Sequence, residues 1–216
     1  MYKYFKRGFD LCSSLFLFFV ISPLFLILAI LVRINLGSPI LFYQERTGKG
    51  KKNFNIMKFR TMTNEKDNEG NLLPDEKRFT RFGRWLRSSS LDELPELFNI
   101  IKGDMSVIGP RPLPPIYNSY FKQDEMARFN VRGGLITPDS VDANPIISWD
   151  KQFEYESDYG KNISLKKDIE IFIGVFRILF IRTETSYGEY VRKPLNVERA
   201  NMIKDEKNTC NSTSPR

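Results

Sequence analysis

The segment that decides the fold runs from Leu11 to Val32, LCSSLFLFFVISPLFLILAILV, 22 residues without a charged side chain. Such a run is about as long as a helix that crosses the apolar core of a bilayer. It is too long for the apolar part of a secretory signal, and no small-x-small cleavage pattern follows it. The sequence therefore predicts a membrane-associated helix near the start of the chain.

The middle of this run carries Ser22 and Pro23, and a proline inside a helix removes one backbone donor and favours a bend. Basic side chains stand on both sides, Lys6 and Arg7 before the run and Arg33 after it. Because basic flanks prefer the cytoplasmic side, a helix bent at Pro23 that enters and leaves through one leaflet satisfies both flanks. A single spanning helix that tolerates the proline is the alternative, and these residues alone leave both open.

The composition excludes several classes of site. The 216 residues include no histidine, which rules out a Ser-His-Asp triad, a zinc ion bound by histidine and a histidine general base. The two cysteines, Cys12 and Cys210, are too few for a disulfide framework or a thiolate metal site. With 33 Lys and Arg against 26 Asp and Glu, the net charge of +7 favours an anionic partner.

The remaining elements indicate an α+β, mostly helical fold. Strand patterns at 40–44 and 54–59 flank a Gly-containing turn and predict a short β-hairpin, and a polar loop follows at 64–77. An amphipathic helix at 78–87 has a basic face that is either solvated or interfacial, and an apolar helix at 169–180 is either core or interfacial. We expect three parts, which are a membrane helix at 1–36, a small cytoplasmic catalytic domain at 37–199 and a polar, disordered tail at 200–216.

The stretch SLDELPEL, residues 90–97, places two carboxylates side by side. Ser90 with Glu93 three residues later is a capping-box pattern, which predicts a helix from about Leu91 that stops at Gly103. Acidic residues in a first turn complement the helix dipole without any catalytic purpose, and on local grounds this ordinary interpretation is favoured.

The turn Gly109-Pro110-Arg111-Pro112 changes that balance. The prolines on both sides restrict the backbone of Arg111. A guanidinium can donate two parallel hydrogen bonds to two oxygens of a phosphate. Carboxylates beside a phosphate site would repel it unless a cation lies between them, and Mg2+ takes one or two carboxylates together with substrate phosphate. The combination indicates phosphoryl transfer at a membrane surface.

The residues from Arg87 to Pro112, R-x-x-S-L-D-E-L-P-x-L-x-N-x-x-x-G-D-M-S-x-x-G-P-R-P, carry a resemblance. They resemble the bacterial sugar transferases, the monotopic phosphoglycosyl transferases that prime glycan assembly on a polyprenyl carrier. The likeness extends over residues 1–182 and includes F-K-R-x-F-D before the apolar run, the central Ser-Pro, Q-x-R-x-G from Gln44 and K-F-R-T-M from Lys58.

The resemblance implies a two-step reaction at the cytoplasmic face of the bacterial cell membrane, with a nucleoside diphosphate sugar, usually of uridine, as donor and polyprenyl phosphate as acceptor. Asp92 is then the nucleophile that forms a covalent phosphosugar, and Glu93 with Asp92 beside it holds Mg2+. Arg111 binds phosphate, while Arg87 and Lys58 are candidates for neutralising charge or for a structural role. The match of Ser22 and Pro23 favours the re-entrant helix.

The sequence departs from the family pattern between Arg132 and Trp149, RGGLITPDSVDANPIISW. Ile136, Ser140 and Asn144 replace the family's threonine, glutamine and second arginine at equal length. We therefore expect Arg132, Ser140 and Asn144 to belong to a substrate loop whose sequence differs from that of the family but whose length is the same. The sequence does not predict which sugar is transferred.

Two alternatives to catalysis remain, a noncatalytic membrane scaffold and an inactive family member. Nucleic-acid binding by the 78–87 helix is disfavoured because a membrane segment and a carboxylate pair do not serve it. The sequence leaves a homo-oligomer open.

Overall fold

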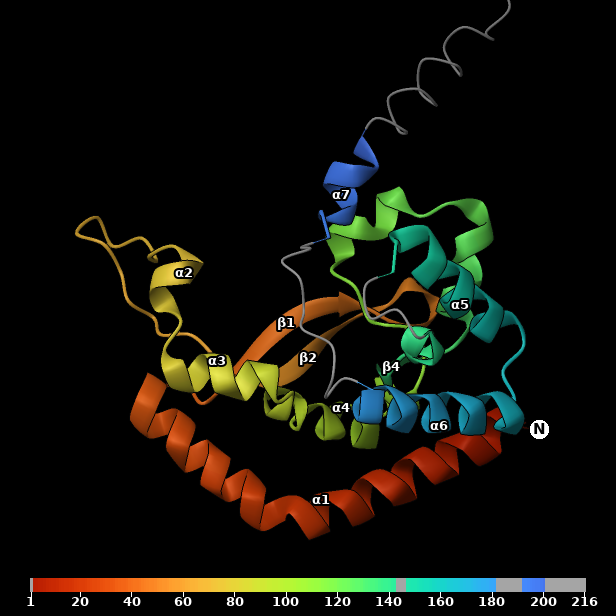
Figure 1. The fold of residues 1–216 in the computed structure, drawn as a ribbon, viewed down its shortest axis with the longest axis horizontal. Helices are drawn as coiled ribbons and strands as arrows, with labels where there is room; N and C mark the ends of the chain where they lie inside the picture. Colours follow the sequence, from red (N-terminus) through yellow and green to blue (C-terminus); the bar gives the residue numbers. More distant parts are fainter. Residues whose placement is uncertain (1, 143–146, 182–191, 201–216) are drawn as a thin grey trace, which may run out of the picture. The chain divides into compact units, whose positions relative to one another are not determined.

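The computed structural model describes residues 2–142, 147–181 and 192–200 (Figure 1). The chain forms two compact units. The first consists of Lys3–Glu45 and Phe54–Val107, and the second contains Arg46–Asn53 and the chain from Ile108 onward. Helices outnumber strands throughout, which confirms the predicted α+β, mostly helical class.

The first unit begins with the helix α1, Tyr2–Leu36, which continues through Pro23. Figure 1 shows this helix bent in its middle, as a central proline predicts. Within it lies an 18-residue window with a mean hydropathy of 3.1, of which only 11% is buried. By length and composition α1 could cross a membrane, and its outward side chains include Phe16 and Phe19, both more than 70% exposed.

The predicted hairpin is confirmed as β1, Leu41–Thr47, and β2, Asn53–Phe59. A short 3-10 turn at Lys49–Lys51 joins the strands, and Gly50 in it takes the left-handed φ of 63° that a residue without a Cβ adopts easily. The hairpin packs on α1 through an apolar cluster within the first unit, whose buried members are Leu28, Val32, Leu36, Phe59 and Leu86.

The next elements are the short helix α2, Asp75–Arg78, and α3, Arg81–Ser88. The amphipathic helix therefore starts at Arg81 rather than at Arg78, because Thr80 is extended and its hydroxyl accepts from the Gly83 N–H at 3.0 Å. Leu86 is completely buried in the apolar cluster, whereas Trp85 is 49% exposed. One side of α3 is thus a core side, and its arginines lie on the exposed side.

The first unit ends with a 3-10 turn at Leu91–Glu93, the helix α4 at Glu96–Lys102 and most of β3, Met105–Ile108. The helix α4 stops at Gly103 with a φ of 97°, as the sequence predicts. Near its end the Arg7 guanidinium of α1 donates to the carbonyls of Ile100 and Ile101, at 2.6 and 2.8 Å. A cation at a helix C-terminus satisfies carbonyls that lack partners inside the helix.

The second unit is built from short helices around an aromatic core. Its 3-10 segments are Pro115–Tyr120, Gln123–Asn130 and Pro138–Val141, its strand is β4, Gly133–Ile136, and its helices are α5, Trp149–Lys161, α6, Leu165–Ile181, and α7, Leu195–Glu198. The core consists of Leu113, Phe121, Phe129, Trp149, Phe153 and Leu195. Close packing needs Gly160, because a Cβ there would lie 2.0 Å from the Ala127 carbonyl oxygen.

The predicted apolar helix is confirmed as α6. Ile171 is 5% exposed, but Phe172, Ile173 and Phe176 are about half exposed. An outward apolar side on this helix favours the interfacial alternative over a pure core helix. The predicted tail from 200 onward lies outside the described residues except for Ala200.

Candidate active site

The carboxylate turn differs from the predicted capping box. Ser90 takes a left-handed conformation, with φ 56° and ψ 13°, and its side chain makes no capping bond. A capping serine needs an extended backbone, so the chain instead makes a 3-10 turn, and α4 begins at Glu96 after Pro95. The expected helix start near Leu91 is therefore wrong by about one turn. Pro95, with φ −64°, is suited to the position before a helix.

Leucines hold this turn in place. Leu91 and Leu94, which bracket the two carboxylates, both pack against the apolar cluster of α1 and the hairpin. Asp92 and Glu93 lie between these two anchors. The leucines of SLDEL thus hold the turn on both sides of its carboxylates.

Asp92 is 7% exposed. Burial raises the pKa of its carboxyl to about 6; the charge of Glu93 adds to this rise, while Lys58 and Arg87 oppose it. At neutral pH the group is therefore mainly ionised. A carboxylate that is ionised, poorly hydrated and flanked by cations is suited to attack phosphorus.

Lys58 links the hairpin to this turn. Its ammonium nitrogen lies 2.6 Å from Glu93 Oε1 and 3.1 Å from Glu96 Oε1. Burial lowers the pKa of Lys58, but the two carboxylates more than offset it and the pKa is raised above its ordinary value. Lys58 is therefore firmly charged beside Asp92. Glu96, which sequence reasoning did not single out, is 3% exposed and completes the cluster.

Arg87 stands in the last turn of α3, with its guanidinium 5.5 Å from the centre of the Phe79 ring. Its charge acts on Asp92 and lowers the pKa of that carboxyl. The first unit thus brings together four predicted site residues, Lys58, Arg87, Asp92 and Glu93. Two cations face an acidic turn, an arrangement that can bind a diphosphate through its charge and still present a nucleophile.

The residues of the turn suit a magnesium ion by their chemistry. Carboxylate oxygens are the hard ligands that Mg2+ takes, and Glu93 is the more exposed of the pair, with 28% of its side chain accessible. Over the described ranges no three His, Cys, Asp or Glu side chains form a group that could hold a metal. Water and substrate phosphate would supply the remaining ligands, as is common for Mg2+.

Arg111 lies in the second unit, and its main chain is held from both sides. Its N–H donates to Glu156 Oε1 at 2.9 Å, and its carbonyl accepts from Arg128 Nη2 at 2.7 Å. Arg128 and Glu156 pair with each other at 2.7 Å and are 2% and 0% exposed along their side chains. The Arg111 side chain itself is exposed, so a buried ion pair fixes the backbone and leaves the guanidinium accessible.

Further contacts tighten this arginine turn, Gly109–Pro112. Gln152 donates to Glu156 Oε1 at 2.9 Å, and Gly133 packs so closely that a Cβ would lie 2.5 Å from the Pro112 ring. Burial raises the pKa of Glu156, and Arg128, Gln152 and the Arg111 amide oppose that rise. Sequence reasoning missed Arg128 and Glu156, because no local pattern marks partners separated by this much chain.

The divergent loop is only partly described. Arg132 is half-buried just before β4, and Ser140 lies in the 3-10 turn after it, where its N–H donates to the Thr137 carbonyl at 3.0 Å. Asn144 lies outside the described residues. The assignment of these three residues to a substrate loop stays a prediction.

Known proteins resemble this chain over most of its length. The family model described as bacterial sugar transferase matches residues 1–182. An uncharacterized sugar transferase of Bacillus subtilis (strain 168), EpsL, is 43% identical over 166 residues, which are 77% of this chain and 82% of that protein.

Two further relatives have names that state their substrates. A UDP-N-acetylgalactosamine-undecaprenyl-phosphate N-acetylgalactosaminephosphotransferase of Aeromonas hydrophila is 34% identical over 192 residues, 83% of this chain and 44% of that protein. A UDP-glucose:undecaprenyl-phosphate glucose-1-phosphate transferase of Klebsiella pneumoniae is 34% identical over 185 residues, 80% of this chain and 40% of that protein. This chain spans less than half the length of these two.

The family match includes the apolar helix, the carboxylate turn and the arginine turn. It confirms the resemblance that the motif from Arg87 to Pro112 predicts, and with it the class of enzyme, a sugar transferase. The chain belongs to the bacterial sugar transferase family.

Proposed function

We propose that this protein transfers a sugar 1-phosphate from a UDP-sugar to polyprenyl phosphate, giving polyprenyl diphosphate sugar and UMP. The observation that carries the proposal is the buried Asp92 carboxylate on a turn anchored by its leucines, with Lys58 and Arg87 beside it. The named relatives from Aeromonas and Klebsiella support the substrate classes, since their names specify UDP-sugars and undecaprenyl phosphate.

In the first step an Asp92 carboxylate oxygen attacks the phosphorus next to the sugar, and the bond from that phosphorus to the UMP oxygen breaks. UMP leaves with the electron pair of that bond, and Asp92 carries the phosphosugar. In the second step an oxygen of polyprenyl phosphate attacks the same phosphorus, which releases the Asp92 carboxylate. Because the carboxylate is already ionised at neutral pH, the reaction needs no base in a chain without histidine.

The other residues bind and neutralise charge. Lys58 and Arg87 stabilise the negative charge that develops on the transferred phosphoryl group, and Arg111 binds phosphate. Glu93 with Asp92 would hold Mg2+, which when bound neutralises the diphosphate of the donor. We place the reaction at the cytoplasmic face of a bacterial cell membrane, with α1 re-entrant, where it would prime a polysaccharide or another glycoconjugate.

The test uses the full chain in detergent with Mg2+, a panel of UDP-sugars and undecaprenyl phosphate, and measures UMP release. We expect release with at least one donor, and a loss of about a thousandfold or more in Asp92→Asn, as for other covalent nucleophiles. Mass spectrometry after incubation with donor alone should find the phosphosugar on the peptide that contains Asp92.

Unchanged turnover in Asp92→Asn would remove Asp92 as the nucleophile. If no donor in the panel gives UMP while the protein still binds lipid tightly, a noncatalytic membrane scaffold or an inactive member is the better description. Asp75→Asn is a matched control, because Asp75 lies on α2, outside the motif and the carboxylate turn, with 63% of its side chain exposed, and pairs with Arg78 at 2.5 Å.

A further inference from the structure

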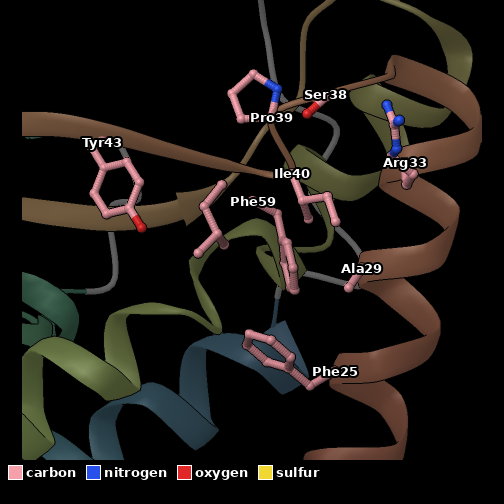
Figure 2. A pocket seen from close by; sticks show the side chains of 9 residues that line it. Phe25, Ala29, Arg33, Ser38, Pro39, Ile40, Tyr43 and Phe59 are labelled. Carbon is pink, nitrogen blue, oxygen red and sulfur yellow. The ribbon is translucent and has the colours of Figure 1, made fainter.

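A pocket of about 450 Å3 lies within the first unit, between the second half of α1 and the hairpin (Figure 2). Its wall on α1 is formed by Phe25, Ala29 and Arg33, which recur every four residues and therefore share one side of the helix. Ile40 and Phe59 line it from the hairpin side. The volume is in the range of small-molecule sites.

The pocket is apolar at one end and cationic at the other. Figure 2 shows Phe25 toward one end and Arg33 with Ser38 toward the other. Along a helix, Phe25 and Arg33 are about 12 Å apart. A ligand that fits would have an apolar chain and an anionic head.

A second arginine strengthens the positive end. Arg60 is 6% exposed and donates to the carbonyls of Leu36 and Ser38, the latter at 2.8 Å, while its Nε is buried without a hydrogen-bond partner. Burial lowers the pKa of Arg60, and the charge of Arg33 lowers it further, so the two cations repel each other. An anion bound at this end would relieve that repulsion.

The surroundings of the pocket are an exposed apolar side of α1 and the apolar cluster behind the hairpin. On α1, Leu26 and Ile30 next to the pocket residues are 62% and 50% exposed. The inner wall residue Phe59 belongs to the apolar cluster against which Leu91 and Leu94 pack. The pocket therefore lies beside an exposed apolar surface of α1, and one of its wall residues packs in the same cluster as the turn that bears Asp92.

We propose that this pocket binds the phosphate end of the polyprenyl acceptor, with the first isoprene units against Phe25, Ala29 and Phe59 and the phosphate at Arg33. The proposal rests on the proposed function, since it assigns a site to the acceptor of that reaction. It commits to the acceptor rather than to a membrane phospholipid, because the wall residue Phe59 shares an apolar cluster with Leu91 and Leu94 of the turn that bears Asp92, where the acceptor must react.

The experiment measures the two steps separately for Arg33→Gln and Ala29→Phe. The first step is followed as phosphosugar formed on Asp92 with donor alone, and the second as the KM for undecaprenyl phosphate in UMP release. We expect the KM to rise about tenfold in Arg33→Gln, the size of one lost charge-assisted contact, and to rise in Ala29→Phe because the larger side chain occupies the pocket, with the first step unchanged in both. Arg33→Lys should recover most of the affinity.

Lys3→Gln and Ile30→Phe are matched controls on exposed positions of the same helix, and both should leave the KM unchanged. An unchanged KM in both pocket variants, with turnover intact, would overturn the pocket assignment and leave the proposed function standing. Absence of phosphosugar in the unaltered protein would instead refute the proposed function. If Ala29→Phe also loses the first step, the substitution has disturbed the packing of the first unit. The KM of Arg33→Gln alone then tests the pocket assignment.

A phospholipid in the pocket gives a different result. Phosphatidylglycerol added to the micelles would then compete with the acceptor, and the competition would disappear in Arg33→Gln without a change in KM measured in its absence. That outcome would assign the pocket to a bound membrane lipid and overturn the proposal.

Discussion

At the scale of single residues, the ionisation of Asp92 should control the first chemical step. Burial raises the pKa of this carboxyl to about 6 from an ordinary 3.8. Below pH 6 the carboxyl is mainly protonated and cannot attack, so the rate of phosphosugar formation should rise about tenfold per pH unit up to pH 6 and then level off. Quench-flow measurement with donor alone between pH 4.5 and 8 checks this.

The absence of histidine makes this profile unusually clear, because no ordinary imidazole titrates near pH 6 in this chain. Glu93→Gln is an informative companion, since the charge of Glu93 helps to raise the pKa of Asp92. In Glu93→Gln the rate of phosphosugar formation should level off at a lower pH than in the unaltered protein. A rate that is flat from pH 5 to 8 would contradict the assignment of Asp92.

The same shift has a consequence for stability. The folded state of a carboxyl with a raised pKa binds more protons than the unfolded state between the two pKa values, so stability falls as pH rises through about 4 to 6. At pH 7 the charged, buried Asp92 costs about 3 kcal/mol at most. Asp92→Asn should therefore raise the unfolding temperature at pH 7 and raise it less at pH 5, as thermal melts can show.

At the scale of elements, the arginine turn depends on the buried pair of Arg128 and Glu156. Glu156→Gln leaves the Arg128 charge without its partner, and losing one member of a buried pair destabilises by about 3–5 kcal/mol. Replacing both, Arg128→Met with Glu156→Leu, should recover much of the stability. It should still lower turnover, because the Arg111 N–H and carbonyl lose the groups that position them.

Urea unfolding in detergent, together with UMP release, separates these effects. Glu154→Gln is the matched control: Glu154 also lies on α5 and pairs with Lys151, but both side chains are about half exposed or more. It should change stability by less than about 1 kcal/mol. Full turnover in the double variant would show that the pair stabilises the second unit without positioning Arg111.

The elements also show what the sequence could predict. The hairpin and the end of α4 follow from local chemistry, since a Gly-containing turn and Gly103 act on their own neighbours. Ser90 was mispredicted because the packing of Leu91 and Leu94 overrides the capping preference of a serine. The contact of Glu156 with Arg111 joins residues 45 positions apart, and no spacing rule reaches that far.

At the scale of the whole molecule, the bend of α1 should decide on which side of the membrane the N-terminus lies. A straight helix of 35 residues is about 52 Å long, well beyond an apolar core of about 30 Å, so α1 could span the membrane if it were straight. With the bend at Pro23, both basic flanks can stay on the cytoplasmic side. In Pro23→Ala the helix should straighten and carry the N-terminus across.

Cysteine labelling measures this directly. In a background without native cysteines, Cys12→Ser with Cys210→Ser, Lys3→Cys reports on the N-terminus and Lys66→Cys, in the exposed loop before α2, reports on the rest of the first unit. A membrane-impermeant maleimide added to intact spheroplasts should miss both cysteines in the protein with Pro23 and should reach only the one at position 3 in Pro23→Ala. Both should react after permeabilisation. Labelling of position 3 from outside with Pro23 in place would establish a spanning helix. The preference of the basic flanks for the cytoplasmic side would then not be enough to keep a helix as long as α1 from crossing the membrane.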